Sequence, residues 1–228
     1  MSVVLILGSA PIAVQAAGWS RDGFDAIVAI NNAHRIRPDW DYAIFPWDFA
    51  VDRRPVANDG QHLVTEAEFV PAQNAYGGFV YAGATMAYTA AYWALAVLRP
   101  TVIAMFGCDM HYPAGAATHF YGAGSPDPLR DDITLRSLEA KSARLMVLAA
   151  KQGCAMINLS QGPSRLIFPR GMESAANLPR FDPVMAEAAL RYEADLNYIS
   201  PSGRYWEELD RFDPAKIDAL DAMWLATV

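Results

Sequence analysis

Short apolar runs alternate with longer amphipathic stretches over the first two thirds of the chain. Runs rich in branched or aromatic residues, bounded by Gly, Pro or Asn, are typical of strands buried on both faces of a sheet. Such runs cover residues 3–7, 25–31, 43–45, 101–106 and 154–159, and a weaker run covers residues 62–64. Apolar residues at helical spacing predict helices over residues 11–18, 83–98 and 129–152. Strands that alternate with helices predict a mostly parallel sheet with helices on both faces.

The pattern changes after Pro169. Two amphipathic stretches, 183–197 and 213–227, predict helices separated by the turn sequence at 200–203. We therefore expect a three-layer α/β domain over residues 1–168. A helical C-terminal extension over residues 169–228 is expected to pack on the same domain, with a face that can form a homo-oligomer.

Composition narrows the classes of partner. The chain has 228 residues, 53% of them hydrophobic, and a net charge of −7. This acidity argues against broad nucleic-acid binding, which needs a basic footprint. Two cysteines, Cys108 and Cys154, are too few for a disulfide framework and predict buried thiols. The low cysteine count also favours a cytoplasmic setting. The apolar stretch 83–98 is shorter than the ~20 residues of a bilayer span, so we expect no membrane span.

The first apolar run ends in a turn, Gly8-Ser9-Ala10-Pro11. Gly permits a tight turn, Ser can cap a helix, and Pro suits the first helical turn. A helix that begins directly after a strand presents unpaired N–H groups, which can bind an anion. The turn lacks the spacing of a P-loop or of a dinucleotide fingerprint, so a plain turn between a strand and a helix fits it equally well.

The second run ends at Asn31-Asn32, where a dinucleotide fold usually carries an acid for the ribose. An amide both donates and accepts hydrogen bonds, so it can bind a base or a ribose. These residues argue against NAD as the ligand but are compatible with another nucleotide. A cap at the end of a strand explains Asn31 equally well.

The run 101–106 stops at Gly107 and Asp109 and opens into a loop that carries His111, His119 and Tyr121. In open α/β sheets, ligands bind in a crevice outside the carboxyl ends of the strands. We therefore take this loop as the centre of the candidate site. Asp109 can bind ribose, orient a histidine, or cap the N–H groups of its own loop.

The chain resembles bacterial sialyltransferases (glycosyltransferase family 42) and the related archaeal-type 6-hydroxymethylpterin diphosphokinases. The resemblance rests on the G-x-D of residues 107–109, the T-H-aromatic-x-G of residues 118–122, the alanine-rich helix before them, the Gly8 turn and Asn31. It covers roughly residues 1–165. It implies a Rossmann-like fold that binds a nucleotide or nucleotide sugar without a further cofactor. The nucleotide-binding residues that it implies are Gly8, Ser9, Asn31, Asn32, Gly83 and Gly107.

The resemblance also implies a catalytic set. His119 is the candidate general base, because histidine titrates near neutral pH, and His111 is the second choice. Asp109 lies at the crevice, and Tyr121 approaches the sugar or phosphate. The chain departs from the sialyltransferases where their base follows the first histidine of this loop, because Ala123 and Gly124 stand there.

Three alternatives remain open at this point. A diphosphokinase-like reaction needs ATP and Mg²⁺, with Asp48 and Asp109 as candidate ligands. Asp109, His111 and His119 also have the ligand types of a divalent metal site, although we expect no metal there. The third alternative is a protein that binds a nucleotide or a sugar without catalysis.

Overall fold

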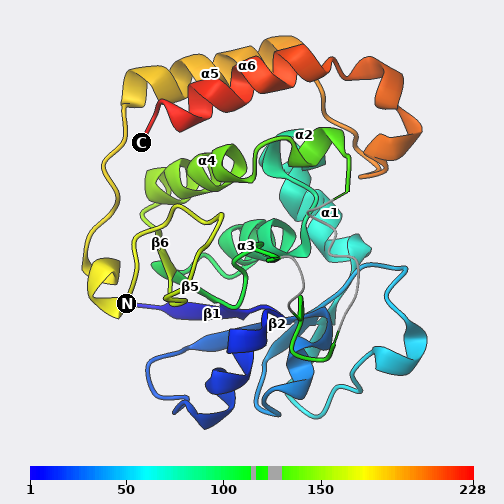
Figure 1. Cartoon of the computed structure of the whole chain (residues 1–228), viewed down its shortest axis with the longest axis vertical. Helices are drawn as coiled ribbons and strands as arrows, with labels where there is room; N and C mark the ends of the chain where they lie inside the picture. Colours follow the sequence, from blue (N-terminus) through cyan, green and yellow to red (C-terminus); the bar gives the residue numbers. More distant parts are fainter. Residues whose placement is uncertain (114–116, 123–129) are drawn as a thin grey trace.

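The computed structural model describes residues 1–113, 117–122 and 130–228. Its centre is a six-stranded parallel sheet, as the alternation of apolar runs and amphipathic stretches predicts (Figure 1). The spatial order is β4-β3-β2-β1-β5-β6. The strands are β1 (Val3–Leu7), β2 (Ala26–Ile30), β3 (Tyr42–Ile44), β4 (His62–Val64), β5 (Val102–Phe106) and β6 (Ala155–Asn158). The fold is thus a three-layer, Rossmann-like α/β fold.

The order of the strands defines a topological switch point beside β1. The chain adds β2, β3 and β4 on one side of β1 and then β5 and β6 on its other side. All residues of β1 and β5 are buried, and the two strands run in register from Val3 opposite Val102 to Leu7 opposite Phe106. Loops diverge at such a point, which opens a crevice at the carboxyl ends of the two strands.

One face of the sheet is covered by α-helices. The helices of this layer are α1 (Glu66–Asn74), α2 (Phe79–Ala82), α3 (Met86–Val97) and α4 (Leu138–Lys151). The buried alanines of α3 let it lie close to the central strands, and α4 packs on β6. Helix α1 follows β4 in a region where the sequence pattern predicted only the strand at 62–64.

Two helices begin later than their apolar pattern predicts. Gly83 adopts a φ of +86°, so α3 begins only after Thr85, whose Oγ1 accepts the Tyr88 N–H. Helix α4 begins after its N-cap Ser137 instead of at residue 129. A short 3-10 helix, η5 (Ile133–Leu135), precedes it, capped by Asp132.

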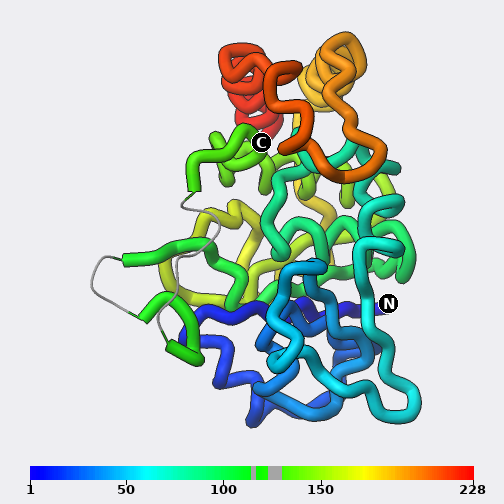
Figure 2. Tube along the Cα trace, turned by 90° about the vertical axis from the view of Figure 1, so that its right-hand side faces the viewer, coloured from blue at the N-terminus to red at the C-terminus, as the bar shows by residue number. Residues whose placement is uncertain are grey.

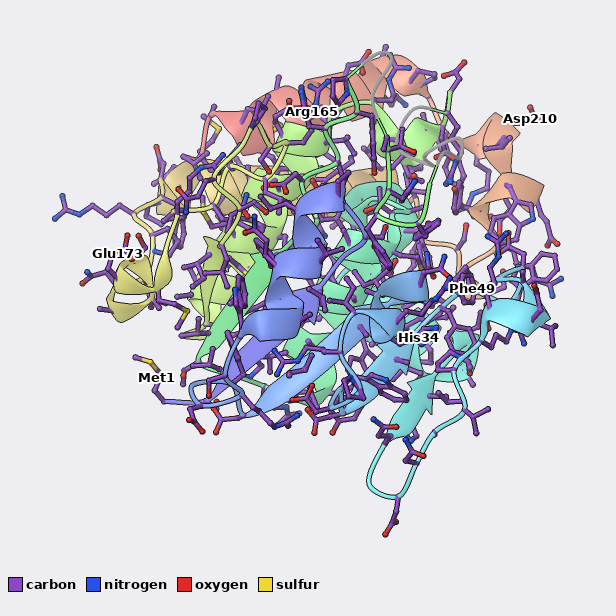
Figure 3. The ribbon with its side chains drawn as sticks, turned by 60° about the horizontal axis from the view of Figure 1, so that its bottom comes forward. Met1, His34, Phe49, Arg165, Glu173 and Asp210 are labelled. Carbon is purple, nitrogen blue, oxygen red and sulfur yellow. The ribbon has the colours of Figure 1, made fainter. Side chains whose placement is uncertain are left out.

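The opposite face of the sheet carries 3-10 helices instead of α-helices. These are η1 (Pro11–Gly18), η2 (Asn31–Arg35) and η6 (Met172–Ala176), with η3 (Val51–Arg53) near the sheet edge. Ala13 and Ala16 of η1 pack on Leu5, Leu7 and Phe106. Figure 3 views the molecule from this side, where His34 Nε2 of η2 lies 3.0 Å from the Arg53 carbonyl oxygen.

The C-terminal extension forms an outer layer. Helices α5 (Pro183–Leu196) and α6 (Pro214–Leu225) pair with each other over α4, on the side away from the sheet (Figures 1 and 2). Each begins with an Asp N-cap followed by Pro. Before them, Arg170 still forms a parallel bridge with Asn158, so the extension starts on the sheet itself. The 3-10 helices η7 (Tyr205–Glu207) and η8 (Leu209–Arg211) connect α5 to α6.

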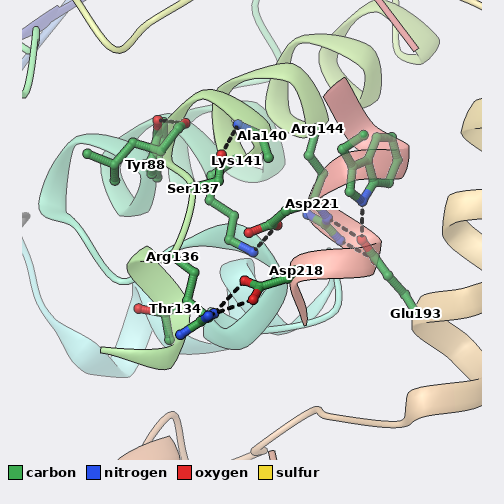
Figure 4. Close-up of polar contacts among 12 residues, drawn as sticks. Tyr88, Thr134, Arg136, Ser137, Ala140, Lys141, Arg144, Glu193, Asp218 and Asp221 are labelled. Atoms are coloured by element: carbon green, nitrogen blue, oxygen red, sulfur yellow. Dashed lines mark hydrogen bonds and ion pairs between the residues drawn. The ribbon is translucent and has the colours of Figure 1, made fainter. Parts of the chain in front are cut away.

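Buried ion pairs fix this outer layer to α4 (Figure 4). Arg144 binds both carboxylate oxygens of Glu193, each at 2.7 Å, and Trp224 Nε1 donates to Glu193 Oε1 at 2.7 Å. Lys141 Nζ lies 2.7 Å from Asp221 Oδ1. Burial raises the pKa of Asp221, although Lys141 opposes the change. The extension is therefore held by matched buried charges as well as by apolar packing.

Two further expectations concern the whole chain. Cys108 and Cys154 are free, buried thiols, as expected. Burial is the main reason why the pKa of the Cys154 thiol rises to about 12. Among the described residues, no helix combines the length and the apolar character that a membrane crossing requires.

Candidate functional site

Two glycines bring the turns after β1 and β5 into direct contact. The Gly8 N–H donates to the Phe106 carbonyl at 2.8 Å, and the Ala10 N–H donates to the Gly107 carbonyl at 3.0 Å. A Cβ at Gly8 would lie 2.3 Å from the Gly107 oxygen. Gly107 has a φ of +68°, and a Cβ there would lie 2.6 Å from Ala13 Cβ. Close packing of the backbone thus requires both glycines, and internal bonds use the N–H groups of Gly8 and Ala10.

Asp109 belongs to a buried polar cluster at the ends of β5 and β6. Its side chain is 7% exposed, and its Oδ1 accepts the Asn158 Nδ2–H at 3.1 Å. Asn158 Oδ1 accepts the Ser160 N–H at 2.9 Å, and Ser160 Oγ accepts the Gly107 N–H at 3.2 Å. The side-chain partner that the structure gives Asp109 is therefore an amide, and the cluster fixes the turn at Gly107.

The segment that carries His119 is seated on the Gly8 turn. His119 and Gly122 form an antiparallel bridge, and the Phe120 N–H donates to the Ser9 carbonyl at 3.0 Å. The imidazole stacks on Tyr121, with ring centroids 5.0 Å apart and an interplanar angle of 23°. Its Nδ1 lies 2.9 Å from Thr118 Oγ1. The fold thus brings His119, Tyr121 and Ser9 together at the switch point.

Other candidate residues have different surroundings. His111 is exposed. Gly83 is buried between α2 and α3, where its carbonyl accepts the Gln73 Nε2–H at 3.2 Å and a Cβ would lie 2.9 Å from the Tyr88 ring. Packing explains the glycine at this position. Ala123 and Gly124, where the resemblance expects the catalytic base, lie outside the described residues.

Asn31 and Asn32 occupy the carboxyl end of β2, the strand next to β1. Asn31 adopts a left-handed backbone with a φ of +50°. The Oδ1 atoms of both amides are buried and have no hydrogen-bond partner among residues 1–113, 117–122 and 130–228. Buried polar groups are nearly always hydrogen-bonded, so unpaired acceptors at a strand end are unusual. They can receive the N–H or O–H groups of a bound ligand.

A pocket of about 620 Å³ lies at the carboxyl end of β3. Its walls come from the loop after β3, from α1, α2 and the start of α3, and from two later segments at 130–132 and 202–206. The sequence did not indicate it, because its walls lie far apart along the chain and Tyr205 and Trp206 look like ordinary packing residues. The volume is within the range of small-molecule sites, about 300–1,000 Å³.

A hydrogen-bonded group joins the C-terminal extension to this pocket. Tyr205 Oη donates to Asp132 Oδ2 at 2.7 Å, and Arg130 Nε donates to the same oxygen at 2.9 Å. Burial tends to raise the pKa of Asp132, but hydrogen bonds from Thr134 and Tyr205 outweigh it and lower the pKa. Burial also raises the pKa of Tyr205 to about 12, so its hydroxyl remains a donor.

Within residues 1–113, 117–122 and 130–228, no three His, Cys, Asp or Glu side chains lie close enough together to bind a metal ion. The two candidate Mg²⁺ ligands lie in different places. Asp48 lines the pocket, whereas Asp109 is hydrogen-bonded to Asn158 at the switch point. Comparisons of the chain with protein-family models, curated proteins and solved structures give no match. A proposal for the function therefore rests on the geometry of the site.

Proposed function

We propose that the chain is a nucleotide-sugar-dependent glycosyltransferase of the sialyltransferase-like type. The observation that carries the proposal is the hydrogen bond of 3.0 Å from the Phe120 N–H to the Ser9 carbonyl. It holds the His119 segment against the turn at the switch point, where open α/β sheets bind their ligands. An imidazole at that position supports a reaction that needs a proton acceptor.

In the proposed reaction, Ser9 and the unpaired amide oxygens of Asn31 and Asn32 bind the nucleotide. His119 takes the proton from the acceptor hydroxyl as its oxygen bonds to the anomeric carbon of the sugar. The bond between that carbon and the phosphate oxygen breaks, and the phosphate leaves with the electron pair. Tyr121, stacked on His119, donates a hydrogen bond to the leaving phosphate.

Thermal unfolding with a panel of ligands tests the nucleotide site. We expect CMP or UDP to raise the melting temperature, because a ligand at about 100 times its Kd stabilises the native state by about 2.7 kcal/mol. A shift only with ATP and Mg²⁺, or only with a pterin, would support the diphosphokinase alternative instead. No shift with any nucleotide would remove the support for both enzymes.

His119→Ala is expected to lower turnover by about 10²- to 10⁴-fold, the usual contribution of a general base, with little change in nucleotide affinity. The assay measures nucleotide release from the sugar donor whose nucleotide gives the largest thermal shift. His111→Ala is the matched control, because His111 is exposed in the same loop. Full turnover in His119→Ala would exclude His119 as the base, and a loss in His111→Ala alone would assign that role to His111.

A further inference from the structure

Aromatic rings form a continuous wall of the 620 Å³ pocket. The rings of Phe69 and Phe79 meet edge to face with centroids 6.4 Å apart, and Phe79 stacks on Tyr205 at 6.3 Å. The ring centroids of Tyr205 and Trp206 are 5.4 Å apart, and these two rings meet edge to face. Trp206 and a second lining residue, Trp47, are 49% and 67% exposed. Exposed apolar side chains that line one pocket together, unlike single exposed ones, mark a site for a ligand or a partner.

Two carboxylates in the described lining have no cationic partner. No salt bridge of residues 1–113, 117–122 and 130–228 includes Asp48 or Glu66. Glu66 Oε1 accepts the N–H of Trp47, which fixes the carboxylate beside that residue. Arg54 holds the same loop through the Trp47 and Phe49 carbonyls but does not line the pocket.

The arginines of the lining have carboxylates of their own. Arg130 pairs with Asp132 at 2.9 Å, and Arg204 lies 3.4 Å from Glu207. The described lining contains three acids (Asp48, Glu66 and Asp132) and two arginines. Since both arginines are paired, the charge left to face a ligand is negative. A ligand with an anionic group would meet this charge unfavourably.

We propose that this pocket binds an organic cation, an ammonium ion that carries an apolar or aromatic body. The faces of Trp and Tyr rings attract a cation, and more strongly where water is displaced. Asp48 and Glu66 supply the countercharge, and Phe69 and Phe79 cover the apolar body. The C-terminal extension completes the site, because it supplies Tyr205 and Trp206. The proposal uses no residue of the switch point, so it is independent of the glycosyltransferase proposal.

Three ligands that share a phenyl group and differ in charge test the preference. Phenethylammonium is the cation, 3-phenylpropan-1-ol is neutral, and 3-phenylpropionate is the anion. Isothermal titration of the full chain at pH 7 measures the three dissociation constants. We expect the cation to bind about tenfold more tightly than the alcohol, which equals about 1.4 kcal/mol. The anion is expected to bind weakest.

Single substitutions test which side chains recognise the charge. Asp48→Asn and Glu66→Gln are each expected to lower the affinity for phenethylammonium about three- to tenfold and to leave the affinity for the alcohol unchanged. Asp52→Asn is the matched control, because Asp52 is an exposed acid of the same loop that does not line the pocket. It changes the net charge equally and is expected to alter neither affinity.

A third variant tests the aromatic wall. Trp206→Leu is expected to weaken the binding of the cation and of the alcohol, while the melting temperature stays near that of the unchanged chain. Equal binding of the three ligands, no binding of any of them at millimolar concentration, or an unchanged preference in Asp48→Asn and Glu66→Gln would each overturn the proposal.

Discussion

Glu193→Gln is expected to lower the free energy of unfolding by about 3–5 kcal/mol, the usual cost of breaking a buried ion pair from one side. Arg144 is 1% exposed, and both oxygens of Glu193 accept its hydrogen bonds at 2.7 Å. Without the carboxylate, the guanidinium remains charged in a site closed to water. Urea denaturation monitored by circular dichroism measures the loss as a lower midpoint at an unchanged slope.

Helix α5, which carries Glu193, also contains a matched control. Glu187 of α5 lies 3.9 Å from Lys151, and both side chains are about half exposed. Because solvent screens such a pair, Glu187→Gln is expected to cost within about 1 kcal/mol. The double variant Arg144→Met with Glu193→Leu is expected to recover part of the loss, since no charge is then buried alone. Equal losses in Glu187→Gln and Glu193→Gln would show that burial of this pair has no energetic weight.

Gly107→Ala is expected to destabilise the fold by about 3 kcal/mol or more. Its φ of +68° costs an L residue roughly 1–2 kcal/mol. The added Cβ would also lie 2.6 Å from Ala13 Cβ, and overpacking of this kind costs about 1–3 kcal/mol. Because Gly107 holds the two turns of the switch point together, nucleotide affinity is expected to fall as well.

Gly153→Ala separates the two contributions. Gly153 has a φ of +76°, but a Cβ there meets no atom within 4 Å. Only the backbone cost of about 1–2 kcal/mol is then expected. Denaturant unfolding of both variants gives the difference, which is the cost of the steric overlap at Gly107. If the two variants lose equal stability, the turns after β1 and β5 can move apart and the contact does not constrain the site.

The strands were the part of the fold that the sequence predicted best. A strand buried on both faces needs apolar side chains at every position, and that local requirement is visible in Val3–Leu7 and Val102–Phe106. The helices were predicted less well. Residues 11–18 form the predicted helix, but it is of the 3-10 type, and α1 was not expected at all. Strand pairing and packing on the sheet decide whether such segments become helices and of which type. Neither can be inferred from the spacing of apolar residues along the chain.

The candidate site shows the same division. The sequence indicated the switch-point turns and the His119 segment, because Gly, Asp and His after an apolar run are a local signal. The polar cluster of Asp109 with Asn158, and the close approach of Gly8 to Gly107, depend on which strands become neighbours. A glycine that a ligand requires and a glycine that a neighbouring backbone requires look alike in a sequence.

By itself, the sequence determined the parallel α/β architecture, the helical nature of the C-terminal extension and the position of the loops at the strand ends, because burial and capping act over a few residues. Only the tertiary structure decided what the extension does. It brings Tyr205 against Phe79 and Asp132, and Trp206 into the wall of the same pocket. Tyr205 and Asp132 are more than 70 residues apart along the chain. Contacts at such separation arise from the packing of whole layers, so the aromatic pocket and its charge exist only in the folded chain.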